Sequence, residues 1–268
     1  MFSYQFMARA LLVGVLVALC AALLGVSLVL KRYSMIGDGL SHVGFGSLAV
    51  ATALGWAPMA VTIPVVMAAA FLLLRLSSRG KLRGDAAIAM ISTGALATGV
   101  IVLSLSTGMT SDVNNYLFGS VLAMSEGDVR LSVWLAGAVL ALFALCYRRI
   151  FSVTFDETFA RATGGHAEWY NTLLALLTAV TIVLGMRVMG AMLISSLVIF
   201  PALTAMRVFK SFRGVTLCAA AVSALCFFTG LCCSYALNTP AGATVVMTNI
   251  LAFLVFSAVG GAAGARKG

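Results

Sequence analysis

Charged side chains are scarce in this chain of 268 residues. Only 9% of the residues are Asp, Glu, Lys or Arg, and 62% are hydrophobic, whereas a soluble domain is roughly 45–50% apolar. Acidic residues are the scarcer kind, with 8 against 17 basic ones. So little charge excludes an ordinary soluble domain. The composition predicts an all-α polytopic membrane protein in which residues 1–268 form a single transmembrane domain.

Sequence motifs of enzymes are also missing. The chain has only two histidines and contains neither HExxH nor a nucleophile elbow, so a membrane-embedded enzyme is not expected. Neither GxxxxGKS nor GxxxxGKT occurs, and the chain therefore does not cradle ATP phosphates itself. The six cysteines lie in apolar runs without a CxxC pair, which indicates small hydrophobic side chains. We expect no enzymatic activity and no permanently bound cofactor.

Long apolar runs are what the sequence does contain. A membrane-spanning helix needs about 20 apolar residues. Nine such runs follow one another: 6–30, 36–55, 59–76, 85–107, 129–147, 170–187, 189–208, 214–237 and 242–263. We therefore expect nine transmembrane helices, with eight as the alternative, because Gly185, Arg187 and Gly190 allow a re-entrant or broken segment. The first run is longer than the apolar part of a signal peptide, so it is counted as a span.

The net charge of +9 is explained by where the basic residues lie. Most of them fall in five clusters between the runs. The clusters are Lys31 and Arg32; Arg75, Arg79, Lys81 and Arg83; Arg148, Arg149 and Arg161; Arg207, Lys210 and Arg213; and Arg266 and Lys267. With nine spans all five lie on one side, which the positive-inside rule makes cytoplasmic. The N-terminus is then outside and the C-terminus cytoplasmic, and no nucleic-acid partner is needed to explain the charge.

An acid and an imidazole lie four residues apart at the start of the second apolar run. Asp38 and His42 would project from one face of a helix, and ionisable side chains within a span are costly and usually functional. Their oxygen and nitrogen ligands suit Mn²⁺, Fe²⁺ or Zn²⁺. One of each is too few for a closed zinc site, but two copies around a two-fold axis would supply four groups. The alternative is structural, with Asp38 capping the helix and His42 bonded to a carbonyl.

The hydrophilic segment after the fifth apolar run indicates a short amphipathic helix. Thr154 is the expected N-cap, Asp156 and Glu157 lie in the first turn, and a glycine pair follows the end. Phe155 and Phe159 are four residues apart, so their rings would share one face, which suits docking into a groove of a partner protein. The alternative is a helix that lies against the membrane.

The seventh apolar run contains a further polar feature. Ser195 and Ser196 precede Pro201, and a proline in a membrane helix tends to kink it and to free a carbonyl. This segment is therefore a candidate for lining a transport path, together with Ser41 beside the Asp38 and His42 pair. A purely structural kink is the alternative.

Five short motifs occur in order along nearly the whole chain. They are GDGLSHV (37–43), YLFGS (116–120), FDETFARATG (155–164), GAMLISSLVIFPA (190–202) and TPAGA (239–243). Together they resemble the permease subunits of bacterial metal ABC importers of the ABC-3 family, for zinc, manganese or iron. The resemblance implies an importer permease fold of the cobalamin and siderophore type. It also implies a homodimer in the bacterial inner membrane that works with two copies of an ABC ATPase and an extracytoplasmic metal-binding protein.

The resemblance also implies roles for particular residues. Asp38 and His42 match an acid and a histidine that family members place on the metal path, and the loop of about 150–168 matches the coupling helix that is seated in the ATPase. The implied coupling residues are Phe155, Asp156, Glu157, Phe159, Ala160, Arg161 and Gly164.

We therefore predict the permease subunit of an ATP-driven importer of a divalent transition metal ion. The ion is zinc first, then manganese or iron, because 239–242 and 116–119 look more like zinc permeases. The alternatives are a permease for a metal chelate and an ion-gradient-driven secondary transporter, although the sequence has no clear inverted repeat. Arg9, Arg130 and Arg187 lie outside the cytoplasmic clusters, and they either meet acids on the binding protein or snorkel at the interface.

Overall fold

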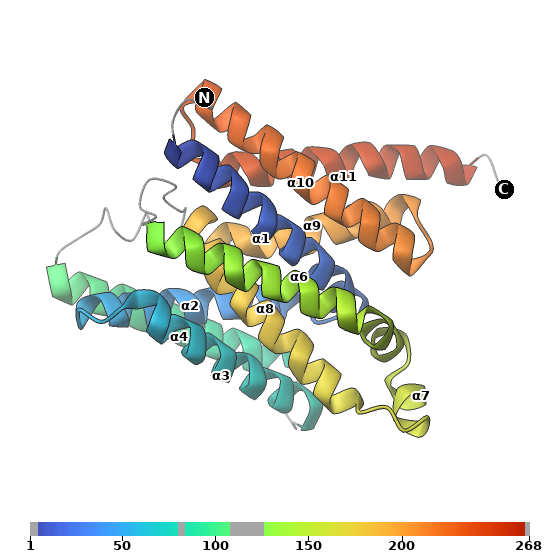
Figure 1. Cartoon of the computed structure of the whole chain (residues 1–268), viewed down its shortest axis with the longest axis horizontal. Coiled ribbons are helices and arrows are strands. Elements are labelled where there is room, and N and C mark those ends of the chain that lie inside the picture. The colour runs from blue at the N-terminus through green and yellow to red at the C-terminus, as the bar shows by residue number, and fades with distance from the viewer. Residues whose placement is uncertain (1–4, 80–83, 108–125, 266–268) are drawn as a thin grey trace.

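Helices form all of the regular structure described for this chain. The computed structural model describes residues 5–79, 84–107 and 126–265, and within these ranges every regular element is an α-helix (Figure 1). The helices are α1 (Gln5–Leu30), α2 (Ser34–Ala53), α3 (Pro58–Arg79), α4 (Gly84–Thr107), α6 (Glu126–Phe155), α7 (Glu157–Ala162), α8 (Ala167–Met189), α9 (Ala191–Val208), α10 (Phe212–Leu237) and α11 (Ala241–Ala265). All except α7 are long, and they match the predicted apolar runs in order. The all-helical prediction is confirmed.

Seven of the described helices are long and apolar enough to cross a membrane. The other two long helices in these ranges are α2, which contains Asp38 and His42, and α9, whose apolar part is the shorter Leu193–Val208. Both pack against helices that qualify as spans, α2 against α3 and α4, and α9 against α1 and α11. Every predicted apolar run is therefore helical, and seven of the helices have the length and composition of a span by themselves.

The described long helices run in alternating directions, so the start of α1 and the end of α11 lie at opposite ends of the bundle (Figure 1). The ends of α1, α3, α6 and α9, at or beside which the described basic residues of the clusters lie, share one end of the bundle with α7 (Figure 1). The chain turns from α8 into α9 at Gly190, where φ is 90°, a conformation that is open to glycine and unfavourable for other residues. The re-entrant or broken segment considered between the sixth and seventh runs is thus a one-residue turn between two helices.

The first helix lies at the centre of the bundle. α1 packs against α6, α8, α9 and α10, and side chains along it, such as Val13, Val17 and Leu24, are fully buried. A Cβ on Gly25 would overlap the carbonyl oxygen of Val198, so the backbones of α1 and α9 touch there. Small residues permit such close contacts between membrane helices, where burial in lipid supplies little net driving force.

The second helix is enclosed because it is rich in glycine. A Cβ on Gly46 would lie 2.5 Å from the carbonyl oxygen of Ala95 in α4, and one on Gly39 would lie 2.7 Å from Cγ2 of Ile88 in the same helix. Larger side chains at these positions would push α4 away. The glycines therefore fix the position of α2, and with it the positions of Asp38 and His42.

Candidate functional site

Asp38 and His42 lie on one face of α2, near the end that follows α1. Oδ2 of Asp38 is 3.7 Å from Nε2 of His42, and the two side chains are 42% and 16% exposed. Nδ1 of His42 is buried and has no hydrogen-bond partner in the described part of the chain. A carboxylate and an imidazole placed in this way offer one oxygen and one nitrogen ligand to a cation.

The structural alternative for this pair, in which Asp38 caps the helix, is wrong. α2 begins at Ser34, its N-cap residue is Tyr33, and no side chain caps it. Asp38 lies in the fifth position of the helix, beyond the reach of the first free N–H groups. His42 also makes no hydrogen bond to a carbonyl among the described residues, since Nδ1 is unpartnered and the acid is the neighbour of Nε2.

A single chain does not supply a complete metal site in the described residues. Within 5–79, 84–107 and 126–265 no group of three or more His, Cys, Asp or Glu side chains is placed to hold an ion. Asp38 and His42 are therefore at most two candidate ligands, fewer than a closed zinc site needs.

The serines predicted to line the path are mostly engaged with their own helices. Ser41 is fully buried, and its hydroxyl donates to the carbonyl of Gly37 at 2.8 Å. The hydroxyl of Ser196 donates to the carbonyl of Leu193 at 2.7 Å. Ser195 is half-buried, and Pro201 lies inside α9 without ending it. A pathway role for these residues stays a prediction.

The predicted coupling segment forms a separate short helix. Asp156 interrupts the chain after α6 with an extended backbone, and its Oδ1 accepts a hydrogen bond from the N–H of Phe159 at 2.8 Å. This bond lowers the pKa of Asp156. The N-cap of α7 is thus Asp156, and the prediction of Thr154 is wrong because α6 continues through Thr154 to Phe155. Gly164, with φ of 75°, follows the end of the helix.

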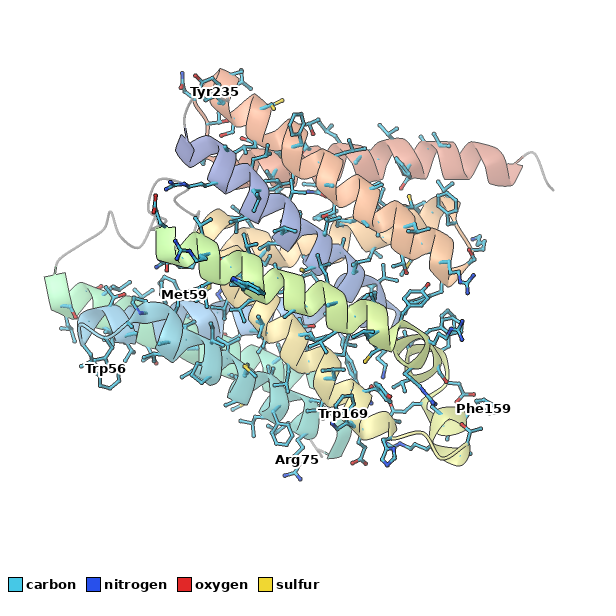
Figure 2. All side chains as sticks on the ribbon, in the orientation of Figure 1. Trp56, Met59, Arg75, Phe159, Trp169 and Tyr235 are labelled. Carbon is cyan, nitrogen blue, oxygen red and sulfur yellow. The ribbon has the colours of Figure 1, made fainter. Side chains whose placement is uncertain are left out.

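Two exposed aromatic rings flank Asp156. Phe155 and Phe159 are 59% and 61% exposed, but the expectation that they share one helical face is wrong. Phe155 ends α6 and packs 4.9 Å from Phe151, ring centre to ring centre. Phe159 belongs to α7, and Figure 2 places it at the edge of the molecule, away from the long helices. The buried Ala160 holds the other side of α7 against the bundle.

The first residue of α7 is tied to two other helices. Glu157 pairs with Lys31 at 3.4 Å and with Arg161 at 2.7 Å, and Lys31 also donates a hydrogen bond to Asn171 in α8. Burial alone would raise the pKa of Glu157, but hydrogen bonds from Asn171 and Lys31, together with the charge of Lys31, hold it below its usual value. Burial lowers the pKa of Lys31 despite the nearby carboxylate.

A polar pocket of about 290 Å³ lies beside this contact. Its lining includes Tyr33, Arg75 and Glu168, and so joins the turn before α2 to the ends of α3 and α8. The contact of Lys31 and Asn171 with Glu157 could not be predicted from local motifs, because Glu157 lies more than a hundred residues away from Lys31.

At the opposite end of the bundle, two of the three basic residues outside the five clusters, Arg9 and Arg187, have partners in this chain. Arg9 pairs with Glu126 at 2.5 Å, and Arg187 pairs with Asp128 at 2.7 Å. Both acids lie at the start of α6, so the two pairs join α6 to α1 and α8. Arg130 is exposed. The YLFGS motif at 116–120 lies outside the described residues.

A family model identifies the chain as a whole. Residues 3–260 match the model of the ABC 3 transport family. The chain belongs to this family. It is accordingly the membrane permease subunit of a metal ABC importer, and not an enzyme, as the motifs predicted.

Curated members of the ABC 3 transport family align over almost their full length. The manganese import system permease protein ScaB of Streptococcus gordonii is 28% identical, over 94% of this chain and 91% of the relative. A probable iron transport system membrane protein of Haemophilus influenzae is 30% identical, over 95% and 90%. A probable metal transport system membrane protein of Treponema pallidum is 30% identical, over 96% and 97%.

Solved structures confirm the fold of this ABC 3 transport family member. PsaBC from Streptococcus pneumoniae, in complex with Fab, has a chain that superposes with a TM-score of 0.85, at 27% identity, over 94% of this chain and 91% of the other. An inward-facing ABC transporter assigned to the metal-chelate type superposes with a TM-score of 0.76 over 93% and 84%. At 16% identity the second likeness concerns the fold alone.

Proposed function

We propose that this permease forms a homodimer that carries a divalent transition metal ion past Asp38 and His42 into the cell. The buried Nδ1 of His42, which has no partner among the described residues and lies on a ring 3.7 Å from Asp38, is the observation that supports this most. Asp38 is partly exposed, so a second copy can approach it. Two pairs around a two-fold axis would bind the ion weakly, as transport requires, because the ion has to leave as well as enter.

The energy comes from partner subunits in this proposal. An extracytoplasmic binding protein delivers the ion, and two ABC ATPase subunits push on α7 from the cytoplasm. The exposed ring of Phe159, on a helix at the edge of the bundle, supports α7 as the docking element. The spans would then rearrange around the pair in an alternating-access cycle, with the N-terminus outside and the C-terminus in the cytoplasm of the bacterial inner membrane.

Manganese is the first ion to test and zinc the second. The name of ScaB refers to manganese import, and that of the Haemophilus influenzae relative refers to iron transport. These names favour manganese and iron over zinc among the ions that Asp and His bind. Zinc remains a candidate on the resemblance of 239–242 to zinc permeases. The chelate alternative has less support, because the similarity to a metal-chelate-type transporter concerns the fold alone.

Uptake by the reconstituted complex tests this function. Permease, ATPase and binding protein are placed in proteoliposomes, and uptake of Mn²⁺, Zn²⁺, Fe²⁺ and a ferric chelate is measured with ATP, without ATP and with an ion gradient alone. ATP-dependent uptake of a free divalent ion supports the proposal. Uptake of the chelate alone would show that the permease transports metal chelates. Uptake driven by the gradient without ATPase would show that it is a secondary transporter.

A further inference from the structure

Lys31 lies at the junction between the coupling segment and the helix that carries the metal pair. It follows the last residue of α1, and its ammonium group contacts Glu157 of α7 and Asn171 of α8. The side chain is only 7% exposed, although it lies in a cluster that the positive-inside rule alone would leave in water. A lysine that is this enclosed depends on its partners for compensation of its charge.

The turn after Lys31 is short and firmly bonded. The N–H of Tyr33 bonds to the carbonyl of Leu28 at 2.8 Å, and the N–H of Arg32 bonds to the carbonyl of Val29 at 3.1 Å. With φ of 60° at Arg32, this is the pattern of a Schellman motif. α2 begins two residues later, at Ser34. A displacement of Lys31 is therefore passed directly to the first turns of α2.

We propose that Lys31 is a positioning residue that transmits the movement of α7 to α2, and so to Asp38 and His42. Asp38 lies seven residues after Lys31 and within the first turns of α2. This inference rests on the proposed function, because it assigns a route by which the ATPase would act on the metal pair. The inference adds the contact of Lys31 with Glu157, and Lys31 belongs neither to the Asp38 and His42 pair nor to the exposed surface of α7 that would dock on the ATPase.

Burial makes the contact stiff. If α7 moved and Lys31 stayed, the enclosed ammonium group would lose the carboxylate of Glu157, which is strongly unfavourable for a buried charge. Burial also lowers the pKa of Lys31. Movement of Lys31 together with Glu157 keeps the ion pair and therefore costs less free energy. The neighbouring pocket of about 290 Å³ gives the side chains of this junction room to move together.

The coupling ratio tests this role. In the reconstituted complex, metal ions taken up per ATP hydrolysed are measured for the wild type and for Lys31→Met, which keeps all but the last heavy atom of the side-chain length and removes its charge. We expect the ratio to fall about tenfold, within the usual range of a coupling between two sites, while hydrolysis stimulated by the metal-loaded binding protein persists. A ratio equal to that of the wild type would overturn the proposal.

Arg32→Asn is the matched control. It removes a positive charge from the same turn, Arg32 is exposed, and asparagine tolerates the positive φ found there. The coupling ratio of Arg32→Asn should stay within twofold of the wild type. An equal fall in both variants would show that any positive charge in this turn has the same effect, and would refute a specific role of Lys31. If Lys31→Met does not assemble, the double variant Lys31→Met with Glu157→Gln removes both charges together. A reduced ratio in that variant supports the role and a wild-type ratio refutes it.

The test separates this inference from the function on which it rests. A wild-type complex that moves no metal with ATP refutes the proposed function, whatever the variants do. A wild-type complex that transports metal, together with an unchanged ratio in Lys31→Met, refutes only the role of Lys31.

Discussion

Among single residues, His42 carries the most direct test of the metal path. His42→Ala removes a ring whose Nδ1 is buried without a partner among the described residues, so the folded chain loses no hydrogen bond of that atom. Loss of an outer-shell partner of a metal ligand costs about 10- to 100-fold in affinity or activity, and loss of the ligand itself should reduce metal uptake by at least as much. Uptake into proteoliposomes measures this, and purification of the complex checks that it still assembles.

The control for His42 lies on the same helix. Ser47 donates its hydroxyl to the carbonyl of Gly44 at 3.0 Å, so Ser47→Ala removes a polar group of α2 that already has a partner in its own helix. Uptake by this variant should match that of the wild type. Undiminished uptake by His42→Ala, with the complex intact, would remove His42 from the path.

Glu157 carries a prediction about pH. Its pKa in the folded chain lies below the usual value, so the ionised form is favoured by folding. The stability that this provides is present above the unfolded pKa of about 4.3 and is lost as the pH falls through the lower, folded pKa. At pH 7 the wild type should therefore unfold at a higher temperature than Glu157→Gln, and the difference should shrink below about pH 4. A difference that is independent of pH would show that the carboxylate is not ionised in the folded chain.

At the scale of elements, the glycines of α2 should be needed for its packing on α4. An added Cβ at Gly46 would lie 2.5 Å from the carbonyl of Ala95, and since both are backbone positions, Gly46→Ala requires the helices to separate. Overpacking of this kind costs about 1–3 kcal/mol, so the detergent-solubilised protein should unfold at a lower temperature. Gly94→Ala in α4 is the matched control, because a Cβ there meets no atom within 4 Å. Equal midpoints for the two variants would contradict the close contact.

The long helices could be predicted from the sequence, but the ends of the coupling helix could not. A run of about 20 apolar residues has few alternatives in a membrane, and each predicted run is helical. Around α7, Thr154 and Asp156 are both good N-caps, and local preference does not choose between them. The choice is made by tertiary packing, because Phe151 and Phe155 of α6 pack on Phe212 of α10 and extend α6 past Thr154.

Part of the candidate site could be predicted from the sequence and part could not. Asp38 and His42 stand out because ionisable residues within an apolar run are rare and their spacing is local. The ion pair between Lys31 and Glu157 joins residues that are 126 positions apart, and no periodicity or motif connects them. Arg9 and Arg187 were open to two interpretations for the same reason, since their partners Glu126 and Asp128 come from a distant helix.

At the scale of the whole molecule, charge and helix direction together predict the orientation in the membrane. The two ends of α10 are suited to a test, because the turns at Lys210 and Thr239 are both exposed and lie before and after this helix. The positive-inside rule predicts that the basic clusters are cytoplasmic, so we expect Lys210 inside and Thr239 outside.

Cysteine labelling in intact spheroplasts distinguishes the two sides. The six native cysteines are first replaced, because Cys233 is exposed near the Thr239 end of α10. A membrane-impermeant maleimide should then label Thr239→Cys directly and Lys210→Cys only after permeabilisation. The reverse pattern would place α7 and the buried Lys31 contact outside the cell, out of reach of an ATPase, and would refute the coupling proposal along with the orientation.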